Sequence, residues 1–351
     1  GEIYSSAEFF ALRDSVGGFV TLMLEGGANR NATGNIYNNA LTGNAQNNLL
    51  QGLDGSDYLD AGGGGLDVLQ GGNGDDVLTG LSSGGNGVFD GGLGNDWLYG
   101  NQANNLFVGG KGNDSICAGY YQPAGSDEDG MPISEFYGAA GRDVLLFNKG
   151  DGMDLVYAGD GAKMTVSLGG GIAYSDLKLS KSGNDLVLIA GLGDGIAFHD
   201  WYAGIGNRSV LNVQVLAEAM STFNTNGADG LRNDSAEQFG FQGVVSAFDN
   251  QANKSNWQIS EALLSNNRGA IPSSDTSALG GDLAYRYGKS GTIGGLSLSG
   301  VQSLIGDTRF GVSTQGLNAV SGGGVVLGGG ARTGPPVLLL NASPTPAWPW
   351  P

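Results

Sequence analysis

An apolar residue returns at a fixed interval along the first half of the chain, each time after a polar stretch rich in glycine, asparagine and aspartate. From residue 33 the interval is nine residues, apart from one extra residue before Ala61 and a longer, degenerate unit at 79–89, and the pattern resumes at 137 after an insertion. Counted from the first glycine of a unit, the apolar residue is the eighth, as in Leu59, Leu69, Leu78, Leu98, Ile116 and Leu145. Such a repeat predicts a solenoid, in which each unit buries its apolar residue against its neighbours.

Each unit divides into a turn and a short strand. In GGNGDDVLT, residues 71–79, the glycines permit positive φ angles and a close approach of backbone carbonyls. Asp76 follows at the sixth position, and Val77 and Leu78 have the apolar character of a strand. Stacked strands of this kind predict a fold that is mainly β.

The pattern G-G-x-G-x-D-x-U-x resembles the RTX, or haemolysin-type, calcium-binding repeat. The resemblance implies a parallel β-roll, expected over residues 33–160, in which two units make one coil. It also implies that Ca²⁺ ions lie between units stacked on the same edge. The composition suits this role, because Ca²⁺ takes oxygen ligands from carboxylates and backbone carbonyls.

With two units per coil, the sixth positions sort into two columns. The first column reads Asn39, Asp57, Asp76, Asp96 and Asp114. The second column reads Asn48, Asp67, Gly87 and Asn105. Since only the first column holds consecutive aspartates, we predict a lopsided roll with three ions, between Asp57 and Asp76, Asp76 and Asp96, and Asp96 and Asp114.

Further acidic residues extend the set of candidate metal ligands to Asp67, Asp143 and Asp154. Lys163 falls where the next acid is due, and a cation there predicts the end of the roll near residue 160. Asparagine-rich units such as TGNAQNNLL, residues 42–50, are expected to hold their turns with side-chain amide hydrogen bonds instead.

Residues 147–215 resemble the haemolysin-type calcium-binding related region that follows RTX repeats in many secreted bacterial proteins, through LGGGIAYSDLKLSKSGNDLVL, HDWY and NRSVLNVQV. We therefore expect a β-rich cap at 161–216 that closes the end of the roll. Its alternating leucines predict two strands joined by a turn at residues 182–184.

A smaller, mixed helical region is expected at 217–325. One helix is predicted from helical spacing after a capping box formed by Asp234 with Glu237 or by Ser235 with Gln238; its apolar face is Phe241, Val244, Val245 and Phe248. A second short helix is predicted in NWQISEALLSNN, residues 256–267. Residues 273–320 resemble the C-terminal endings of large RTX proteins exported by type I secretion.

The two ends of the chain lack the nine-residue pattern of the repeats. Residues 1–32 form an N-terminal segment in which FVTLML, residues 19–24, is a candidate strand for donation to the sheet edge of another subunit. Residues 326–351 form a tail of glycine, proline and tryptophan that we expect to dock on a neighbouring subunit.

Composition narrows the range of partners. The chain of 351 residues has 34 acidic and 16 basic residues, a formal net charge of −18, and 67 glycines. This charge argues against nucleic acid and against anionic membrane surfaces, both of which favour basic patches. A single cysteine, Cys117, excludes an internal disulfide framework, and no apolar run is long enough to predict insertion into a membrane.

No catalytic motif is evident, and we predict that the chain is not an enzyme. His199 is the only histidine and lies in a strand-like stretch, where a structural or surface role is expected. The sequence contains no H-E-x-x-H and no P-loop motif. Cys117 is expected to be a buried or incidental thiol rather than a nucleophile.

Three functions remain open from the sequence. The first is a secreted, calcium-binding structural protein of the cell surface or extracellular matrix, which self-assembles into a homo-oligomeric fibre or surface layer after calcium-induced folding. The alternative is the C-terminal secretion and folding module of a larger type I-secreted enzyme, toxin or adhesin. The third is a binding module for a surface glycan.

Overall fold

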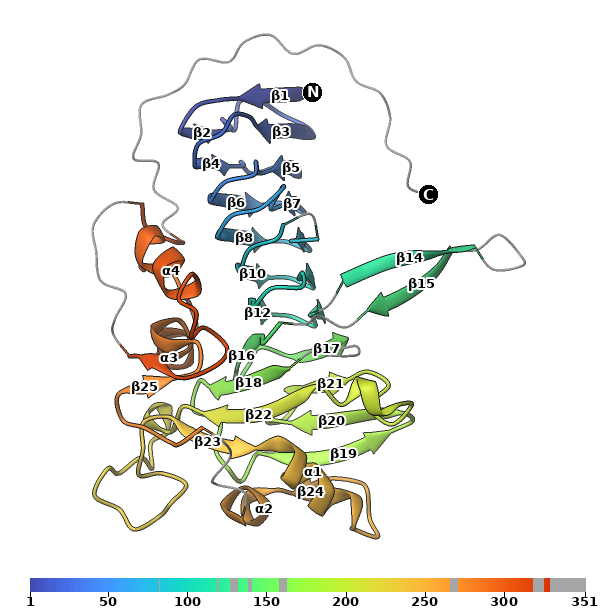
Figure 1. The fold of residues 1–351 in the computed structure, drawn as a ribbon, viewed down its shortest axis with the longest axis vertical. Coiled ribbons are helices and arrows are strands. Elements are labelled where there is room, and N and C mark those ends of the chain that lie inside the picture. Colours follow the sequence, from blue (N-terminus) through green and yellow to red (C-terminus); the bar gives the residue numbers. More distant parts are fainter. Residues whose placement is uncertain are drawn as a thin grey trace.

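The computed structural model of the chain contains two long sheets that face each other along a stack of coils (Figure 1). It describes residues 1–328 except 82, 119, 127–131, 138–140, 158–162, 266–270 and 318–324. The first sheet has the order β1 (Glu2–Ser5), β3 (Val20–Leu24), β5 (Asn39–Thr42), β7 (Tyr58–Asp60), β9 (Val77–Thr79), β11 (Trp97–Tyr99), β13 (Ser115–Cys117), β17 (Met153–Tyr157), β21 (Gly195–Phe198), β20 (Asp185–Ile189), β19 (Lys178–Ser182) and β24 (Trp257–Gln258).

The second sheet has the order β2 (Phe9–Ala11), β4 (Arg30–Thr33), β6 (Asn48–Asp54), β8 (Asp67–Asn73), β10 (Gly87–Leu93), β12 (Leu106–Lys111), β16 (Val144–Asn148), β18 (Met164–Gly169), β22 (Val210–Val215) and β23 (Glu237–Gly240). Consecutive strands of the chain alternate between the two sheets, and the neighbours within the stack are parallel. The prediction of a mainly β fold with a parallel β-roll is confirmed.

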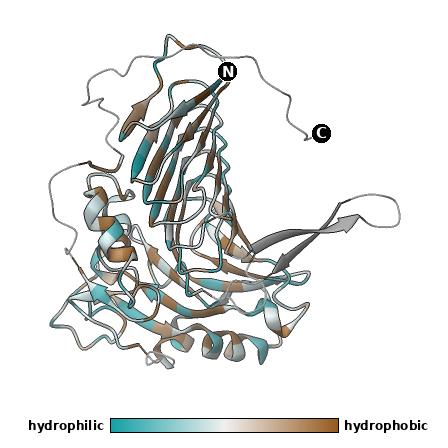
Figure 2. Ribbon diagram, turned by 45° about the horizontal axis from the view of Figure 1, so that its top comes forward, coloured by the Kyte–Doolittle hydropathy of each residue, from teal (hydrophilic) through white to brown (hydrophobic). Residues whose placement is uncertain are grey.

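The eighth position of the repeat builds the core between the sheets. Leu41, Leu59, Leu78, Leu98 and Ile116 stand opposite one another in successive strands of the first sheet. All five are fully buried. Figure 2 shows how much of the strand stack is hydrophobic. A nine-residue unit therefore folds as it does because each coil covers the apolar residue of the coil beside it.

The solenoid begins well before residue 33. Val20–Leu24 is an inner strand of the chain's own first sheet, paired with β1 on one side and β5 on the other. Leu22 stands opposite Leu41 and is fully buried, so it extends the apolar column into the segment that lacks the glycine pattern. The segment expected as a donated strand is thus paired within its own chain in this structure.

The roll also continues past residue 160. β17 and β21 extend the first sheet, and β18 and β22 extend the second. The register of β16 with β18 places Met164, rather than Lys163, opposite Asp143, and Met164 is fully buried. The second column therefore ends here, because an apolar side chain occupies the position after Asp143; in the first column, the buried Ile196 stands opposite Asp154.

The predicted turn at residues 182–184 is confirmed, since β19 and β20 pair antiparallel from Ser182 opposite Asp185. The insertion forms a separate antiparallel hairpin of β14 (Tyr120–Ser126) and β15 (Pro132–Tyr137), which projects from the stack (Figure 1). The chain leaves the roll after β13 and re-enters it at β16.

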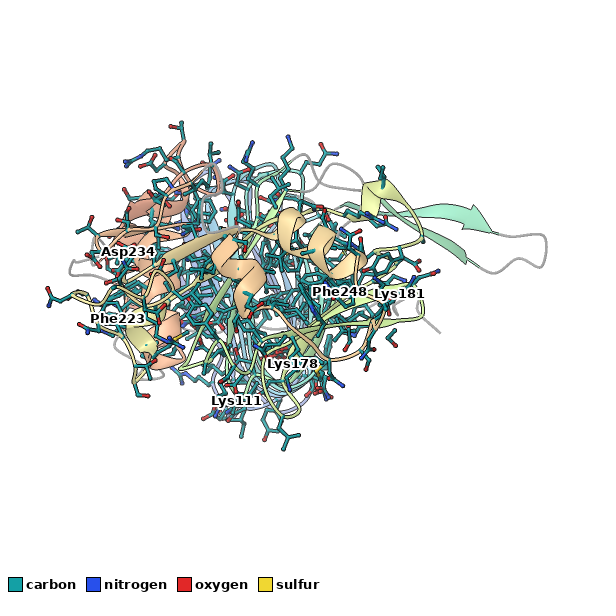
Figure 3. All side chains as sticks on the ribbon, turned by 90° about the horizontal axis from the view of Figure 1, so that it is seen from below. Lys111, Lys178, Lys181, Phe223, Asp234 and Phe248 are labelled. Carbon is teal, nitrogen blue, oxygen red and sulfur yellow. The ribbon has the colours of Figure 1, made fainter. Side chains whose placement is uncertain are left out.

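Helices α1 (Phe241–Asp249) and α2 (Ser260–Ser265) lie at the closed end of the roll, which Figure 3 views directly with Phe248 labelled. The apolar face predicted for α1 is buried. The predicted capping box is wrong, because Glu237 lies in β23 and the helix begins four residues later at Phe241. Glu237 does accept hydrogen bonds from the backbone N–H groups of Asn233 and Asp234, but it fixes a turn before a strand.

Helices α3 (Gly281–Ser290) and α4 (Leu298–Ile305) pack on the outer face of the second sheet (Figure 1). The face that they cover carries aliphatic residues at the seventh position of the repeat, Leu49, Val68, Val88, Leu106 and Val144, all fully buried. Side-chain amides of the roll fasten this region: Asn86 donates to the Ile305 carbonyl at 2.6 Å and Asn104 to the Phe310 carbonyl at 2.8 Å.

The remaining elements are short. They are the hairpin of β25 (Ser277–Ala278) and β26 (Gln315–Gly316) and the 3₁₀ turns η1 (Ile205–Asn207) and η2 (Ala217–Ala219).

Candidate metal centre along the turns of the roll

The first column assembles as a continuous line of carboxylates along one edge of the stack. Each sixth-position backbone N–H donates to a carboxylate Oδ1 in the next coil, at 2.6 Å to Asp57, 2.7 Å to Asp76, 2.8 Å to Asp96 and 2.8 Å to Asp114. The donors are, in the same order, Asn39, Asp57, Asp76 and Asp96. These bonds hold Oδ1 of each carboxylate in place. The Oδ2 atom then points toward the glycine turn of the same unit.

The second oxygen of these carboxylates has no hydrogen-bond partner. The buried Oδ2 atoms of Asp57, Asp76, Asp96 and Asp114 all lack a donor. A buried carboxylate without a compensating partner is strongly unfavourable, so each of these atoms requires a cation or a proton.

A backbone carbonyl lies across a glycine from three of these oxygens, those of Asp57, Asp76 and Asp96. A Cβ built at Gly71 would lie 2.3 Å from Asp76 Oδ2 and 2.6 Å from the carbonyl oxygen of Gly91 in the next coil. The same two contacts recur at Gly52 and again at Gly91. Because only glycine leaves this space, the turn brings a carboxylate and a carbonyl from adjacent coils around one point, which is the oxygen donor set that Ca²⁺ prefers.

Burial raises the pKa of every carboxyl group in the first column. The pKa rises to about 7 for Asp57 and Asp76, to about 8 for Asp96 and to about 6 for Asp114. Burial is the main cause, and neighbouring carboxylates raise the pKa further, as Asp114 and Asp76 do for Asp96. In the described part of the chain none of these four carboxylates forms an ion pair with a basic side chain, so a proton or a bound cation is needed to neutralise them.

The two aspartates after the insertion return to register. The N–H of Asp114 donates to Asp154 Oδ1 at 3.1 Å, so Asp154 extends the first column. The N–H of Asn105 donates to Asp143 Oδ1 at 2.8 Å, so Asp143 extends the second. Burial raises the pKa of Asp154 to about 9 and that of Asp143 to about 8.

The second column differs at two of its turns, where aromatic side chains fill the space beside the first glycine. Cβ atoms built at Gly80 and Gly100 would each meet a phenylalanine ring at 2.6 Å, Phe89 in one case and Phe107 in the other. The two rings stack on each other with centroids 5.4 Å apart. In this column Asp67 has its Oδ2 bonded by the Ser83 hydroxyl at 3.2 Å, and burial raises its pKa to about 8.

The two columns of aspartates are predicted from the sequence, whereas the role of these phenylalanines is not. A partial signal exists, since the eighth position is Leu59, Leu78 and Leu98 in the first column and, after Leu50 and Leu69, Phe89 and Phe107 in the second. A larger ring at that position fills the volume that the first column leaves beside its glycines.

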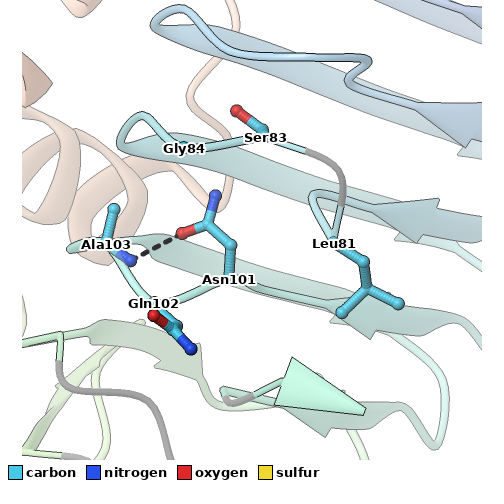
Figure 4. Close-up of a pocket in the computed structure, with 6 residues that line it drawn as sticks. All are labelled: Leu81, Ser83, Gly84, Asn101, Gln102 and Ala103. Atoms are coloured by element: carbon cyan, nitrogen blue, oxygen red, sulfur yellow. Dashed lines mark hydrogen bonds between the residues drawn. The ribbon is translucent and has the colours of Figure 1, made fainter. Parts of the chain in front are cut away.

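A pocket of about 350 Å³ lies at the degenerate unit (Figure 4). It is lined by Leu81, Ser83, Gly84, Asn101, Gln102 and Ala103. Asn101 Oδ1 accepts a hydrogen bond from the backbone N–H of Ala103 at 2.8 Å, drawn as a dashed line. These lining residues carry no charge, so the pocket offers neutral hydrogen-bonding groups only.

His199 lies outside both columns, between two carboxylates. Its Nδ1 is 3.4 Å from Asp185 Oδ1 and its Nε2 is 3.4 Å from Asp200 Oδ2, and all three side chains are partly exposed. Cys117 is buried. Within the part of the chain that the structure describes, no helix is long and apolar enough to cross a membrane.

Comparison with known proteins agrees with the repeat geometry. The family model of the RTX calcium-binding nonapeptide repeat matches residues 33–65, 62–83 and 81–116. No curated protein matches the chain. A solved structure, the extracellular lipase LipA from Serratia marcescens, aligns at 18% identity over 54% of this chain with a TM-score of 0.26; the alignment spans 39% of the lipase chain.

Proposed function

We propose, for a chain whose residues 33–116 are RTX calcium-binding nonapeptide repeats, that calcium binding along the first column drives the folding of a secreted structural protein. The observation that carries the proposal is the line of buried Oδ2 atoms, each without a donor, with a glycine carbonyl of the next coil close to those of Asp57, Asp76 and Asp96. When bound, Ca²⁺ supplies the positive charge that these carboxylates lack.

The ligand set follows from the register. Three ions lie between the pairs Asp57 and Asp76, Asp76 and Asp96, and Asp96 and Asp114, and Asp154 provides the carboxylate for a fourth beside Asp114. Asp143 also has a buried Oδ2 without a partner, whereas Asp67 Oδ2 is satisfied by Ser83. Calcium therefore concentrates on the first column.

Folding is coupled to the ions because the metal-free column is unfavourable. The buried carboxylates repel one another, and the many glycines favour the unfolded chain. Binding free energy then becomes folding free energy. Extracellular calcium modules work at about 10⁻⁴ to 10⁻³ M, so the chain stays unfolded in the low calcium of a cytosol, passes through a type I exporter and folds outside.

The assembly half of the proposal concerns the open, N-terminal end of the stack. β1 and β2 are the terminal strands of the two sheets, and Tyr4, Phe9 and Phe19 at this end are 56%, 39% and 50% exposed. Strand edges with exposed aromatic residues favour an added protein surface. That surface is another subunit in a fibre or surface layer; in the alternative, a secretion and folding module, it is a preceding domain of a larger protein.

Circular dichroism during a calcium titration tests the folding half, with magnesium in parallel as the control for ionic strength. The expected result is a gain of β signal with calcium alone. A complete β signal in excess chelator would overturn the proposal.

Sedimentation in millimolar calcium tests the assembly half. Deletion of residues 331–351, which lie outside the described residues, should leave calcium-dependent folding intact and abolish large assemblies. A full chain that sediments as a monomer in calcium contradicts self-assembly and favours the module.

A further inference from the structure

Three turns of the roll share a second motif, G-N-x-x-N-N, in place of G-G-x-G-x-D. They are GNIYNN at 34–39, GNAQNN at 43–48 and GNQANN at 100–105. The first belongs to the first column, and the other two belong to the second. Each has asparagine at the second and sixth positions, where the acidic turns have glycine or leucine and aspartate.

In the turn at 34–39, the two asparagines form a closed set of hydrogen bonds. The Asn35 side-chain amide donates to the carbonyls of Arg13 and Val16, in the preceding coil, at 3.1 and 3.2 Å. The Asn35 N–H donates to Asn39 Oδ1 at 2.8 Å. One side-chain amide therefore satisfies the hydrogen-bonding capacity of two backbone carbonyls.

The turn at 43–48 repeats this arrangement in the other column. The Asn44 amide donates to the carbonyls of Gly26 and Ala28 at 3.0 and 2.9 Å, and the Asn44 N–H donates to Asn48 Oδ1 at 2.8 Å. In the turn at 100–105, Asn101 donates to the Gly85 carbonyl at 2.9 Å. A bond from the second-position amide to a carbonyl therefore recurs at all three turns, and the N–H to Oδ1 bond recurs at 34–39 and 43–48.

The backbone of these turns also differs from that of the acidic turns. At the second and fourth positions, the acidic turns have positive φ, for example 117° at Gly72 and 124° at Gly74. Asn35, Tyr37, Asn44 and Gln46 are not among the described residues with positive φ. The asparagine turn thus keeps ordinary backbone angles and directs an amide, instead of carbonyls, toward the neighbouring coil.

We infer that the G-N-x-x-N-N turn closes the coil in place of a calcium ion, so that the second, fourth and sixth positions decide whether a turn takes Ca²⁺ or an asparagine amide. The inference rests on the proposed calcium function of the first column. The inference applies to turns that have the same space as the acidic turns, as the turn at 34–39 does: a Cβ at Gly34 would lie 2.5 Å from Asn39 Oδ1 and 2.3 Å from the Gly52 carbonyl, much as at Gly71.

The consequence is a roll with two kinds of coil. Asparagine is neutral, so the turns at 34–39 and 43–48 carry no mutual repulsion when calcium is absent, in contrast to the line of carboxylates that follows them. The N-terminal coils hold their turns without calcium, and dependence on calcium begins at the turn that ends in Asp57.

A graft tests the inference by gain of function. Asn35→Gly, Tyr37→Gly and Asn39→Asp together convert GNIYNN into GGIGND, which differs by one aliphatic residue from the native GGLGND at 91–96. Native mass spectrometry and titration calorimetry of the full chain should show one more bound Ca²⁺ than the wild type. A folded graft with the wild-type number of ions overturns the inference.

The matched control applies the same three changes at 100–105, as Asn101→Gly, Ala103→Gly and Asn105→Asp. Here the Phe107 ring lies where a Cβ at Gly100 would be, 2.6 Å away, so no ion is gained. An added ion at both grafts would show that aspartate alone recruits calcium and would contradict the roles of the turn and its space.

If a graft fails to fold, hydrogen exchange of the wild-type chain in chelator tests whether the asparagine turns are held without calcium. The N–H groups of Asn35 and Asn44 should be protected at least about tenfold more than those of Asp76 and Asp96. Equal protection contradicts the inference. A wild type that binds no calcium at all is a failure of the proposed function instead, and the two failures are therefore distinguishable.

Discussion

The two columns of the roll stack their turns in the same way but differ in the groups that lie beside the glycines. Both stack sixth-position residues through N–H to Oδ1 bonds, as Asp76 does with Asp96 and Asn48 does with Asp67. The first column leaves carboxylate oxygens unpaired beside glycines, whereas the second fills that space with Phe89 and Phe107. On our proposal, a nine-residue repeat is therefore held by an ion in the first column and by side chains in the second, according to the residues at three or four positions.

The pH dependence of the metal-free protein gives the largest expected effect. Burial places the pKa values of Asp57, Asp76 and Asp96 at about 7 to 8, above the ordinary value of 3.8. A raised pKa in the folded state stabilises the fold below about pH 4, and this stability is lost as the pH rises through 7 to 8. In chelator, circular dichroism should show more β structure at pH 5 than at pH 8.

With calcium present, the effect of pH on folding is expected to be the opposite: the folded state is favoured at higher pH. Protons compete with the metal for the same carboxylates, so the calcium concentration at the folding midpoint should rise as the pH falls. Parallel pH profiles with and without calcium would contradict the assignment of these carboxylates as ligands.

Removal of a phenylalanine ring from the second column is expected to have the next largest effect. Phe107→Ala should lower the free energy of unfolding in saturating calcium by about 3–5 kcal/mol, because it leaves a cavity between the sheets. Chemical denaturation measures the loss, and native mass spectrometry should find the number of bound ions unchanged. Loss of an ion together with the stability would mean that the ring supports a metal site.

A matched pair of aspartates compares the columns directly. Asp76→Ala removes a ligand shared by two proposed ions and should raise the calcium concentration at the folding midpoint by about tenfold or more, equivalent to at least about 1.4 kcal/mol. Asp67→Ala should shift it far less, since Asp67 Oδ2 already has a donor in Ser83. Equal shifts would refute the lopsided roll.

The smallest expected effect concerns the first acidic turn. Leu53 holds a φ of 84° at a position where the following turns have Gly72, Gly92 and Gly110. Non-glycine residues pay roughly 1–2 kcal/mol for this conformation, so Leu53→Gly should stabilise the calcium-bound roll by about 1 kcal/mol. Thermal unfolding measures the gain, and Leu93→Gly, at a neighbouring position without positive φ, provides the control.

Much of the candidate site could be predicted because the repeat is strictly local. Counting in nines sets the register from Asp96 to Asp114, and the motif of each unit sets it where one extra residue or the longer unit at 79–89 intervenes, so Asp57, Asp76, Asp96 and Asp114 come together as predicted. The insertion removes this guide. After the hairpin, Asp143 aligns with Asn105 in the second column and Asp154 with Asp114 in the first, and the length of the insertion does not predict this alignment.

The sequence by itself determined the unit, the alternation of columns and the excess of carboxylates in one of them, because these depend on residues close together in the chain. Only the tertiary structure decided that Phe89 and Phe107 fill the second column, that Val20–Leu24 continues the first sheet, and that α3 and α4 cover the second. Each of these is a contact between segments far apart in the sequence. Such contacts depend on which apolar surface remains uncovered after the coils have stacked, and that surface exists only once the roll has formed.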